Sequence, residues 1–339
     1  MTDVRQLPFD PELTWGARNA IVTCLRVQPD EKVTLITDLA TSEIAAALLA
    51  ELDKVGSTCH AFVTEDYAVR PLTNQPAAIL EDMETSQVSI FAAQAQLGEL
   101  QTRMQMTDVV NRRKIRHAHM VNITKEIMLH GMRADFIEVD RISQHVWEAA
   151  SRAKQVRATT QAGTNLVADM NPNYKWVKTS GIISTSKWGN LPGGETFTSP
   201  GEVNGIFVVD GVVGDYLCAR YGDLRETPLT LTIQGNRLVS AVSANKQLEK
   251  EFWEYTHADE NSDRVGEFAI GTNIGVRDVI GNILQDEKIP GVHIAFGNPY
   301  GAHTGAEWYS GTHIDVVGRK FDIWLDDLQI MREGKFLID

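Results

Sequence analysis

The sequence lacks most features of secreted and membrane proteins. Its three cysteines, Cys24, Cys59 and Cys218, lie far apart and form neither a CxxC pair nor a secreted-type framework. The first residues contain no apolar stretch of the length that a signal peptide needs. No window approaches the roughly 20 apolar residues of a membrane-spanning helix. We therefore expect a cytoplasmic protein without a membrane partner.

The chain also lacks a long block of basic residues. It contains 32 Lys and Arg against 45 Asp and Glu, which gives a formal net charge of −13. The short basic run "NRRKIRHAH" is more typical of a solvated helix face than of a nucleic-acid site. Nucleic acid is therefore disfavoured as a partner. With 43% apolar residues among 339, the chain is large enough for one large domain or two of ordinary size.

The first half of the chain alternates predicted strands and helices. The segments Lys32–Ala40 and Ser57–Asp66 are rich in β-branched residues and predict strands. Between them, Thr41–Gly56 predicts a helix with a capping residue at its start and a glycine at its end. This order indicates a βαβ unit and a parallel sheet, to which Val88–Ala95 adds a third strand.

The texture of the sequence changes in the second half. An amphipathic helix is expected around 136–153, where apolar residues recur at spacings of three and four. From about Ala158, short β-rich pieces separated by glycine predict mostly antiparallel sheets. We expect a mixed α/β fold (α+β overall), with an α/β domain over 1–157 and a β-rich domain over 158–339.

Acidic and imidazole side chains of the second half fall at or near the starts of apolar strands. In "GTHIDVV", His313 and Asp315 are two residues apart, so in a strand they point to the same face. Acidic and imidazole side chains that only faced solvent would not need to lie at the starts of apolar strands. Four further side chains share this unusual placement: Glu195, Glu267, Glu287 and His293.

If these side chains are buried together, their charges need compensation. A buried ionised group costs several kcal/mol unless it is paired or bound to metal. One or two divalent ions would reconcile the set, and imidazole with carboxylate suits Zn, Co, Mn or Fe(II) better than Ca or Mg. Spacing alone leaves structural alternatives open, since His313 and Asp315 would form an ordinary buried pair and Glu267 a solvent-facing charge at a strand end.

Four segments resemble the hallmarks of the aminopeptidase T-type metallo-aminopeptidases. They are "NLPGGETFTSP" followed by "VNGIFVVDG", then "GEFAIGTN", "DEKIPGVHIAFGNPY" and "HIDVV", in the same order as in that family. The resemblance covers roughly Ala162 to Leu337, and the amino-terminal half matches only in its α/β texture. Two departures stand out: the interval from Glu287 to His293 is longer than in the family, and Ile314 replaces the usual aromatic residue.

The resemblance implies a hydrolase that releases amino-terminal residues from peptides through a water activated by two divalent ions (Zn, Co or Mn). It also implies a homodimer. Tyr300 would hydrogen-bond the substrate or the developing oxyanion, and either Glu195 or Glu267 would carry the proton from the water to the leaving amine. The implied metal ligands are Glu195, Glu267, Glu287, His293, His313 and Asp315.

The sequence leaves other functions open. Ring-cleaving dioxygenases of dihydroxypyridine are similar in fold and bind one Fe(II) through a His–His–Asp set. Here Glu267 stands where such an enzyme would be expected to place a histidine. Glu195 and His293 are also present, although a dioxygenase would not need them. Both departures favour the hydrolase. An amide hydrolase acting on a non-peptide substrate and a non-catalytic metal-binding protein are the remaining alternatives.

Overall fold

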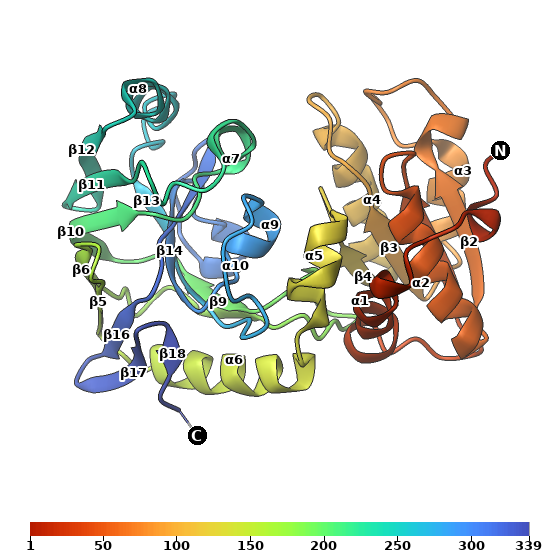
Figure 1. Cartoon of the computed structure of the whole chain (residues 1–339), viewed down its shortest axis with the longest axis horizontal. Coiled ribbons are helices and arrows are strands. Elements are labelled where there is room, and N and C mark those ends of the chain that lie inside the picture. Colours follow the sequence, from red (N-terminus) through yellow and green to blue (C-terminus); the bar gives the residue numbers. More distant parts are fainter. Residues whose placement is uncertain (339) are drawn as a thin grey trace. The chain divides into compact units, whose positions relative to one another are not determined.

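The computed structural model describes residues 1–338, which form two compact units. Unit 1 comprises Met1–Ile137 and Gly181–Gly193. Unit 2 comprises Glu138–Ser180 and the described residues from Gly194 onward. Unit 1 contains one parallel sheet, and unit 2 contains two antiparallel sheets. This confirms the expected mixed α/β class (Figure 1). Within residues 1–338, no helix combines the length and apolar character needed to cross a membrane.

The sheet of unit 1 has five strands in the order β2-β1-β3-β4-β8, all parallel. The last of these belongs to the segment that returns to unit 1 late in the chain. The strands are β1 (Lys32–Thr37), β2 (Thr58–Val63), β3 (Val88–Ala92), β4 (Arg116–His119) and β8 (Gly189–Asn190). The α-helices are α1 (Thr14–Arg18), α2 (Ser42–Val55), α3 (Ala77–Met83), α4 (Leu100–Arg113) and α5 (Lys125–Leu129).

Helix α2 shows how local sequence produces the predicted βαβ unit. It begins after Thr41, and its run of Ala and Leu is buried. It ends at Gly56, whose φ of 85° is the left-handed conformation that glycine adopts without strain. The Gly56 N–H donates to the carbonyls of Leu52 and Asp53, which closes the last turn. The chain then enters β2, parallel to β1 as expected.

Unit 2 contains two antiparallel sheets. The eight-stranded sheet has the order β12-β11-β10-β6-β5-β16-β17-β18, and the five-stranded sheet has the order β15-β14-β13-β9-β7. The strands of the first are β5 (Gln155–Thr159), β6 (Asn165–Asp169), β10 (Glu202–Val209), β11 (Leu229–Gln234), β12 (Arg237–Ser243), β16 (Asp322–Leu325), β17 (Leu328–Arg332) and β18 (Lys335–Phe336). Those of the second are β7 (Val177–Thr179), β9 (Glu195–Thr198), β13 (Val265–Gly271), β14 (Gly291–Gly297) and β15 (His313–Val317).

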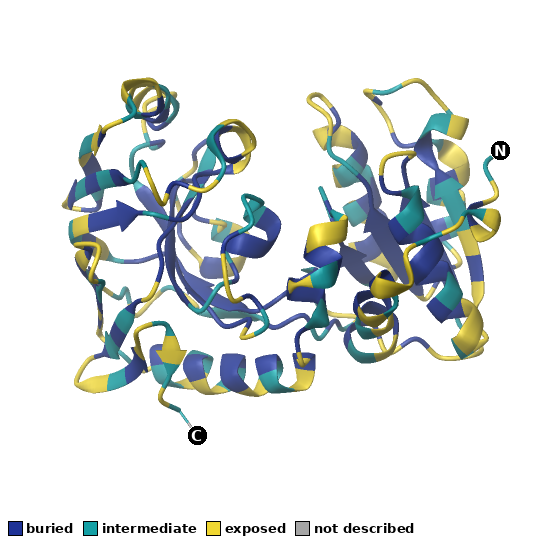
Figure 2. Ribbon diagram, viewed as in Figure 1, coloured by how far each residue is buried: buried dark blue, intermediate teal, exposed yellow. Residues whose placement is uncertain are grey.

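The α-helices of unit 2 begin with a long amphipathic one, and this helix shifts the expected domain boundary. Buried and exposed residues alternate along it (Figure 2). Its residues Ile142, Val146 and Ala150 join the core formed by the strands of unit 2. The units therefore divide near residue 137, whereas the change of texture placed the boundary at 157. The helices are α6 (Phe136–Ala150), α7 (Asp215–Tyr221), α8 (Lys246–Tyr255), α9 (Ile283–Asp286) and α10 (Gly301–Thr304).

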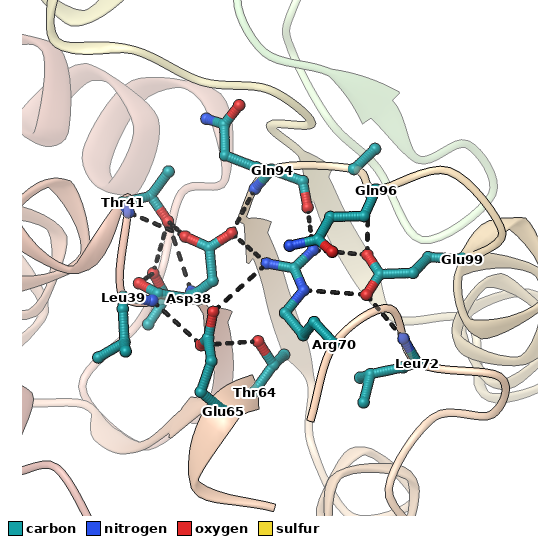
Figure 3. A network of polar contacts seen from close by, with 12 residues as sticks. Asp38, Leu39, Thr41, Thr64, Glu65, Arg70, Leu72, Gln94, Gln96 and Glu99 are labelled. Atoms are coloured by element: carbon teal, nitrogen blue, oxygen red, sulfur yellow. Dashed lines mark hydrogen bonds and ion pairs between the residues drawn. The ribbon is translucent and has the colours of Figure 1, made fainter. Parts of the chain in front are cut away.

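A buried polar network joins loops that follow the carboxyl ends of strands of the parallel sheet (Figure 3). Arg70 donates two hydrogen bonds to Glu99, of 2.9 and 2.5 Å, and one of 2.5 Å to Asp38. Asp38 also accepts from the backbone N–H groups of Thr41 and Gln94. Asp38 follows β1, and Gln94 follows β3. The two carboxylates thus share one arginine and are hydrogen-bonded within the protein, which indicates a structural clamp.

We predict that Arg70→Met destabilises the protein by about 3–5 kcal/mol, because it leaves Asp38 and Glu99 buried without their cation. Urea unfolding followed by circular dichroism measures the change. Arg112→Met is the control, since Arg112 forms an exposed pair with Glu84 and its loss should leave the unfolding midpoint unchanged. Equal midpoints for Arg70→Met and the unsubstituted protein would show that the network does not act as a clamp.

Candidate metal centre

The register of the five-stranded sheet places four of the predicted residues on one face. Directly opposed residues of antiparallel strands share a face, as do residues two apart along one strand. Glu267 is opposed to Ala295, and Ala295 is opposed to Asp315. His293 is two residues before Ala295, and His313 is two before Asp315. Side chains from three strands therefore point to the same side of the sheet.

Glu195 joins this face from a fourth strand. It is opposed to Gly271, which lies four residues after Glu267 on β13. The other face of the sheet is apolar and lies in the core of unit 2, which explains why acids and imidazoles alternate with large apolar residues in the sequence. Ile314, where the sequence departs from the aromatic residue of the resembled family, is on this apolar face and fully buried. The apolar residues are Phe268, Ile270, Ile294, Phe296, Ile314 and Val316.

The distances between the imidazoles and carboxylates are those expected across a metal ion. His293 Nε2 lies 3.5 Å from Glu195 Oε2 and 3.5 Å from Glu267 Oε1. His313 Nε2 lies 3.7 Å from Glu267 Oε2 and 3.4 Å from Asp315 Oδ1. Two ligand atoms that are each about 2.1 Å from a tetrahedral ion are about 3.4 Å apart. The donor atoms of Glu195, Glu267 and His293 all lie within 4.8 Å of one another.

The orientation of the two imidazoles also fits metal ligands. His313 Nδ1 lies 3.0 Å from the carbonyl oxygen of Asn298 and donates to it when that nitrogen carries the proton, which leaves the lone pair of Nε2 facing the carboxylates. His293 Nδ1 is buried and has no hydrogen-bond partner among residues 1–338. Its Nε2 faces Glu195 and Glu267, so both histidines present the same nitrogen to the cluster.

Burial and mutual charge shift the pKa values of the cluster in opposite directions. Burial alone would lower the pKa of His313, but Asp315 raises it to about 10. Burial alone would raise the pKa of Asp315, but His313 lowers it to about 2. Burial raises the pKa of Glu267, whereas in Glu195 the effect of burial is outweighed by Lys288 and His293, and its pKa is lowered. These are the features of a site in which charge is concentrated and water is scarce.

The sixth predicted ligand, Glu287, lies at the end of α9 and contacts a residue that the sequence analysis missed. Lys288 Nζ is 2.5 Å from Glu287 Oε1 and 2.7 Å from Glu195 Oε1. Lys288 is 1% exposed, and although burial opposes its charge, the two carboxylates raise its pKa above the ordinary value. Thr179 donates a further hydrogen bond of 3.0 Å to Glu195 Oε1. The sequence signal that could have pointed to Lys288 is a charged residue just before an apolar strand. The sequence gives no comparable signal for Thr179.

Gly271 brings Lys288 to this position. A Cβ at residue 271 would lie 2.0 Å from the carbonyl oxygen of Ile289, so only glycine permits the segment after α9 to approach β13 so closely. The backbone N–H of Asn273 donates to the carbonyl of Lys288. The placement of Lys288 is therefore fixed by the backbone on both sides of its side chain.

Tyr300 lies between the carboxylate cluster and an open cavity. Its ring centroid is 4.4 Å from that of His313 and 6.2 Å from that of Phe197. Although 42% of the residue is exposed, burial of its phenol and the nearby carboxylates raise its pKa well above the ordinary value. The cavity has a volume of about 390 Å³, and its lining includes Tyr300, His303 and Trp308.

The structure thus brings all seven predicted residues into one region of unit 2. Two solved structures share the fold. One is a 2,5-dihydroxypyridine dioxygenase from Pseudomonas putida KT2440, with 14% identity over 100% of this chain and 99% of that chain and a TM-score of 0.70. The other is wild-type AmpT from Thermus thermophilus, with 16% identity over 98% of this chain and 100% of that chain and a TM-score of 0.68.

Sequence comparison gives the family. No curated relative matches the chain in sequence. The family model of the thermophilic metalloproteases (M29) matches residues 138–318, which include every predicted site residue from Glu195 to Asp315. Because this match spans more than half of the 339 residues, the chain belongs to the thermophilic metalloprotease family M29.

Proposed function

We propose that the protein is a metal-dependent aminopeptidase. The observation that supports this most strongly is the set of four imidazole–carboxylate separations of 3.4–3.7 Å on one buried face of the sheet. Membership of a metalloprotease family supports peptide hydrolysis as the reaction. The choice of an aminopeptidase rests on the ordered motifs that resemble aminopeptidase T, and the homodimer and the cytoplasmic location remain predictions.

Glu267 occupies the centre of the proposed ligand set. Its Oε1 faces His293 and its Oε2 faces His313, so the two oxygens serve two groups of donors. Glu195 completes the first group and Asp315 the second. This arrangement supports two divalent ions that share Glu267. When bound, such ions supply Lewis acidity and a water molecule whose pKa is lowered toward neutrality.

The remaining residues have roles around the reacting peptide. Tyr300 keeps its proton near neutral pH because its pKa is raised, so its hydroxyl can donate a hydrogen bond to the developing oxyanion. Glu195 and Glu267 are the candidates to carry the proton of the attacking water to the leaving amine, and the one that serves must release an oxygen from its other contacts to do so. The cavity beside Tyr300 is the space for the substrate.

A ring-cleaving dioxygenase with one Fe(II) is the second candidate, because a dihydroxypyridine dioxygenase shares the fold. The position of Glu267 among the ligands and the presence of Glu195 favour the hydrolase over it. An amide hydrolase acting on a non-peptide substrate would use the same centre. Elemental mass spectrometry of the purified protein separates either hydrolase from the dioxygenase, since Zn, Co or Mn supports hydrolysis and a single iron supports ring cleavage.

We predict that Glu267→Ala lowers peptide hydrolysis by at least about 100-fold, because it removes the donor shared by both groups. Release of the first residue from short peptides with added Zn, Co or Mn measures the effect, and circular dichroism checks the fold. Glu202→Ala is the control, since Glu202 is an exposed residue of β10. Full activity of Glu267→Ala would refute the site assignment.

We also predict that metal binding releases protons and strengthens as the pH rises. Without an ion, the pKa of His313 is raised to about 10, so the imidazole carries a proton at neutral pH. An ion must displace this proton to reach Nε2, and acid therefore opposes binding. Calorimetric titration in buffers of different ionisation enthalpy should show net proton release near neutral pH. Binding without proton release would place the ion away from His313.

A further inference from the structure

We propose that Lys288 is a built-in counter-ion that keeps Glu287 out of the metal coordination sphere. The inference rests on the proposed metal centre and revises its ligand set. Glu287 belongs to the six ligands that the resemblance implies, but the contacts of its carboxylate differ from those of the other five.

The difference lies in the distances. Glu195 Oε2, Glu267 and Asp315 stand 3.4–3.7 Å from the imidazole nitrogens, which leaves space for an ion between ligand atoms. Glu287 Oε1 and Glu195 Oε1 instead lie 2.5 and 2.7 Å from Lys288 Nζ. These are direct charge-assisted hydrogen bonds. The space between Glu195 and Glu287, where an ion shared by them would bind, is filled by the ammonium group.

Lys288 cannot easily give way to an ion. The residue is 1% exposed, and the N–H and C=O of its backbone are bonded to the Gln285 carbonyl and the Asn273 N–H. Moving the ammonium group would leave it buried without a partner, which is costly. A divalent ion beside it would meet strong like-charge repulsion in a medium of low dielectric constant. The ammonium and an ion therefore exclude each other at this position.

Charge balance agrees with this ligand set. The centre contains four carboxylates, those of Glu195, Glu267, Glu287 and Asp315. Lys288 neutralises one of their charges. The other three charges, together with one hydroxide, balance two divalent ions when both histidines are neutral. Glu195 then contributes only Oε2 to the metals, because Lys288 and Thr179 hold Oε1.

The test compares Glu287→Leu with Glu267→Leu, its matched control on the same site. Metal content per chain is measured by elemental mass spectrometry after saturation with Zn and removal of excess, with circular dichroism as a check of folding. We expect Glu287→Leu to retain the metal content of the unsubstituted protein and Glu267→Leu to lose at least one ion. Loss of an ion from Glu287→Leu would overturn the inference. Absence of metal from the unsubstituted protein would instead overturn the proposed function.

A second variant tests Lys288 directly. Lys288→Met leaves Glu195 and Glu287 without their cation, so Zn affinity, measured by chelator competition, should rise by roughly tenfold or more. Lys250→Met is the control, because Lys250 pairs with Glu254 on the exposed side of α8 and its loss should leave affinity unchanged. Unchanged affinity in Lys288→Met would overturn the counter-ion role. The Glu287→Leu comparison decides the question if Lys288→Met does not fold.

Discussion

The accumulation of negative charge on one buried face of a β-sheet is the constraint on which the functional part of this protein depends. Strands β9, β13, β14 and β15 all contribute polar side chains to this face, and the loop after α9 adds Glu287 and Lys288. Such a set is stable only when cations are present, because each buried carboxylate would otherwise lose its hydration without compensation. The protein supplies one cation itself, Lys288, and two imidazoles. The remaining negative charge is what supports the proposal of a metal centre on this face.

Unit 1 provides an internal comparison. The carboxylates of Asp38 and Glu99 are also buried, but Arg70 and backbone N–H groups satisfy them at direct hydrogen-bond distances. These contacts are made without a metal ion, and the cluster holds loops of unit 1 together. In unit 2 the imidazole nitrogens and the carboxylates stay 3.4–3.7 Å apart. Both clusters contain buried carboxylates, but the wider separations in unit 2 are the feature that supports the proposal of a metal ion there.

Much of the fold and of the candidate site could be predicted from the sequence, because the signals are local. Alternation in "GTHIDVV" placed His313 and Asp315 on one face, and the ordered motifs indicated which other residues belong with them. The domain boundary was predicted too late because α6 carries no mark of the unit into which its apolar face packs. Lys288 was missed because its meaning depends on Glu195, a residue far away in sequence that only the folded sheet brings to it.

The most direct test of the central claim is a crystal structure of the metal-saturated protein with anomalous scattering recorded at the absorption edge of the bound element. We expect two anomalous peaks, each from an ion bound to an imidazole nitrogen. One should lie among Glu195, Glu267 and His293, and the other among Glu267, His313 and Asp315. We expect no peak between Glu195 and Glu287, where Lys288 remains. Peaks only away from both histidines, or a peak between those two glutamates, would contradict the account.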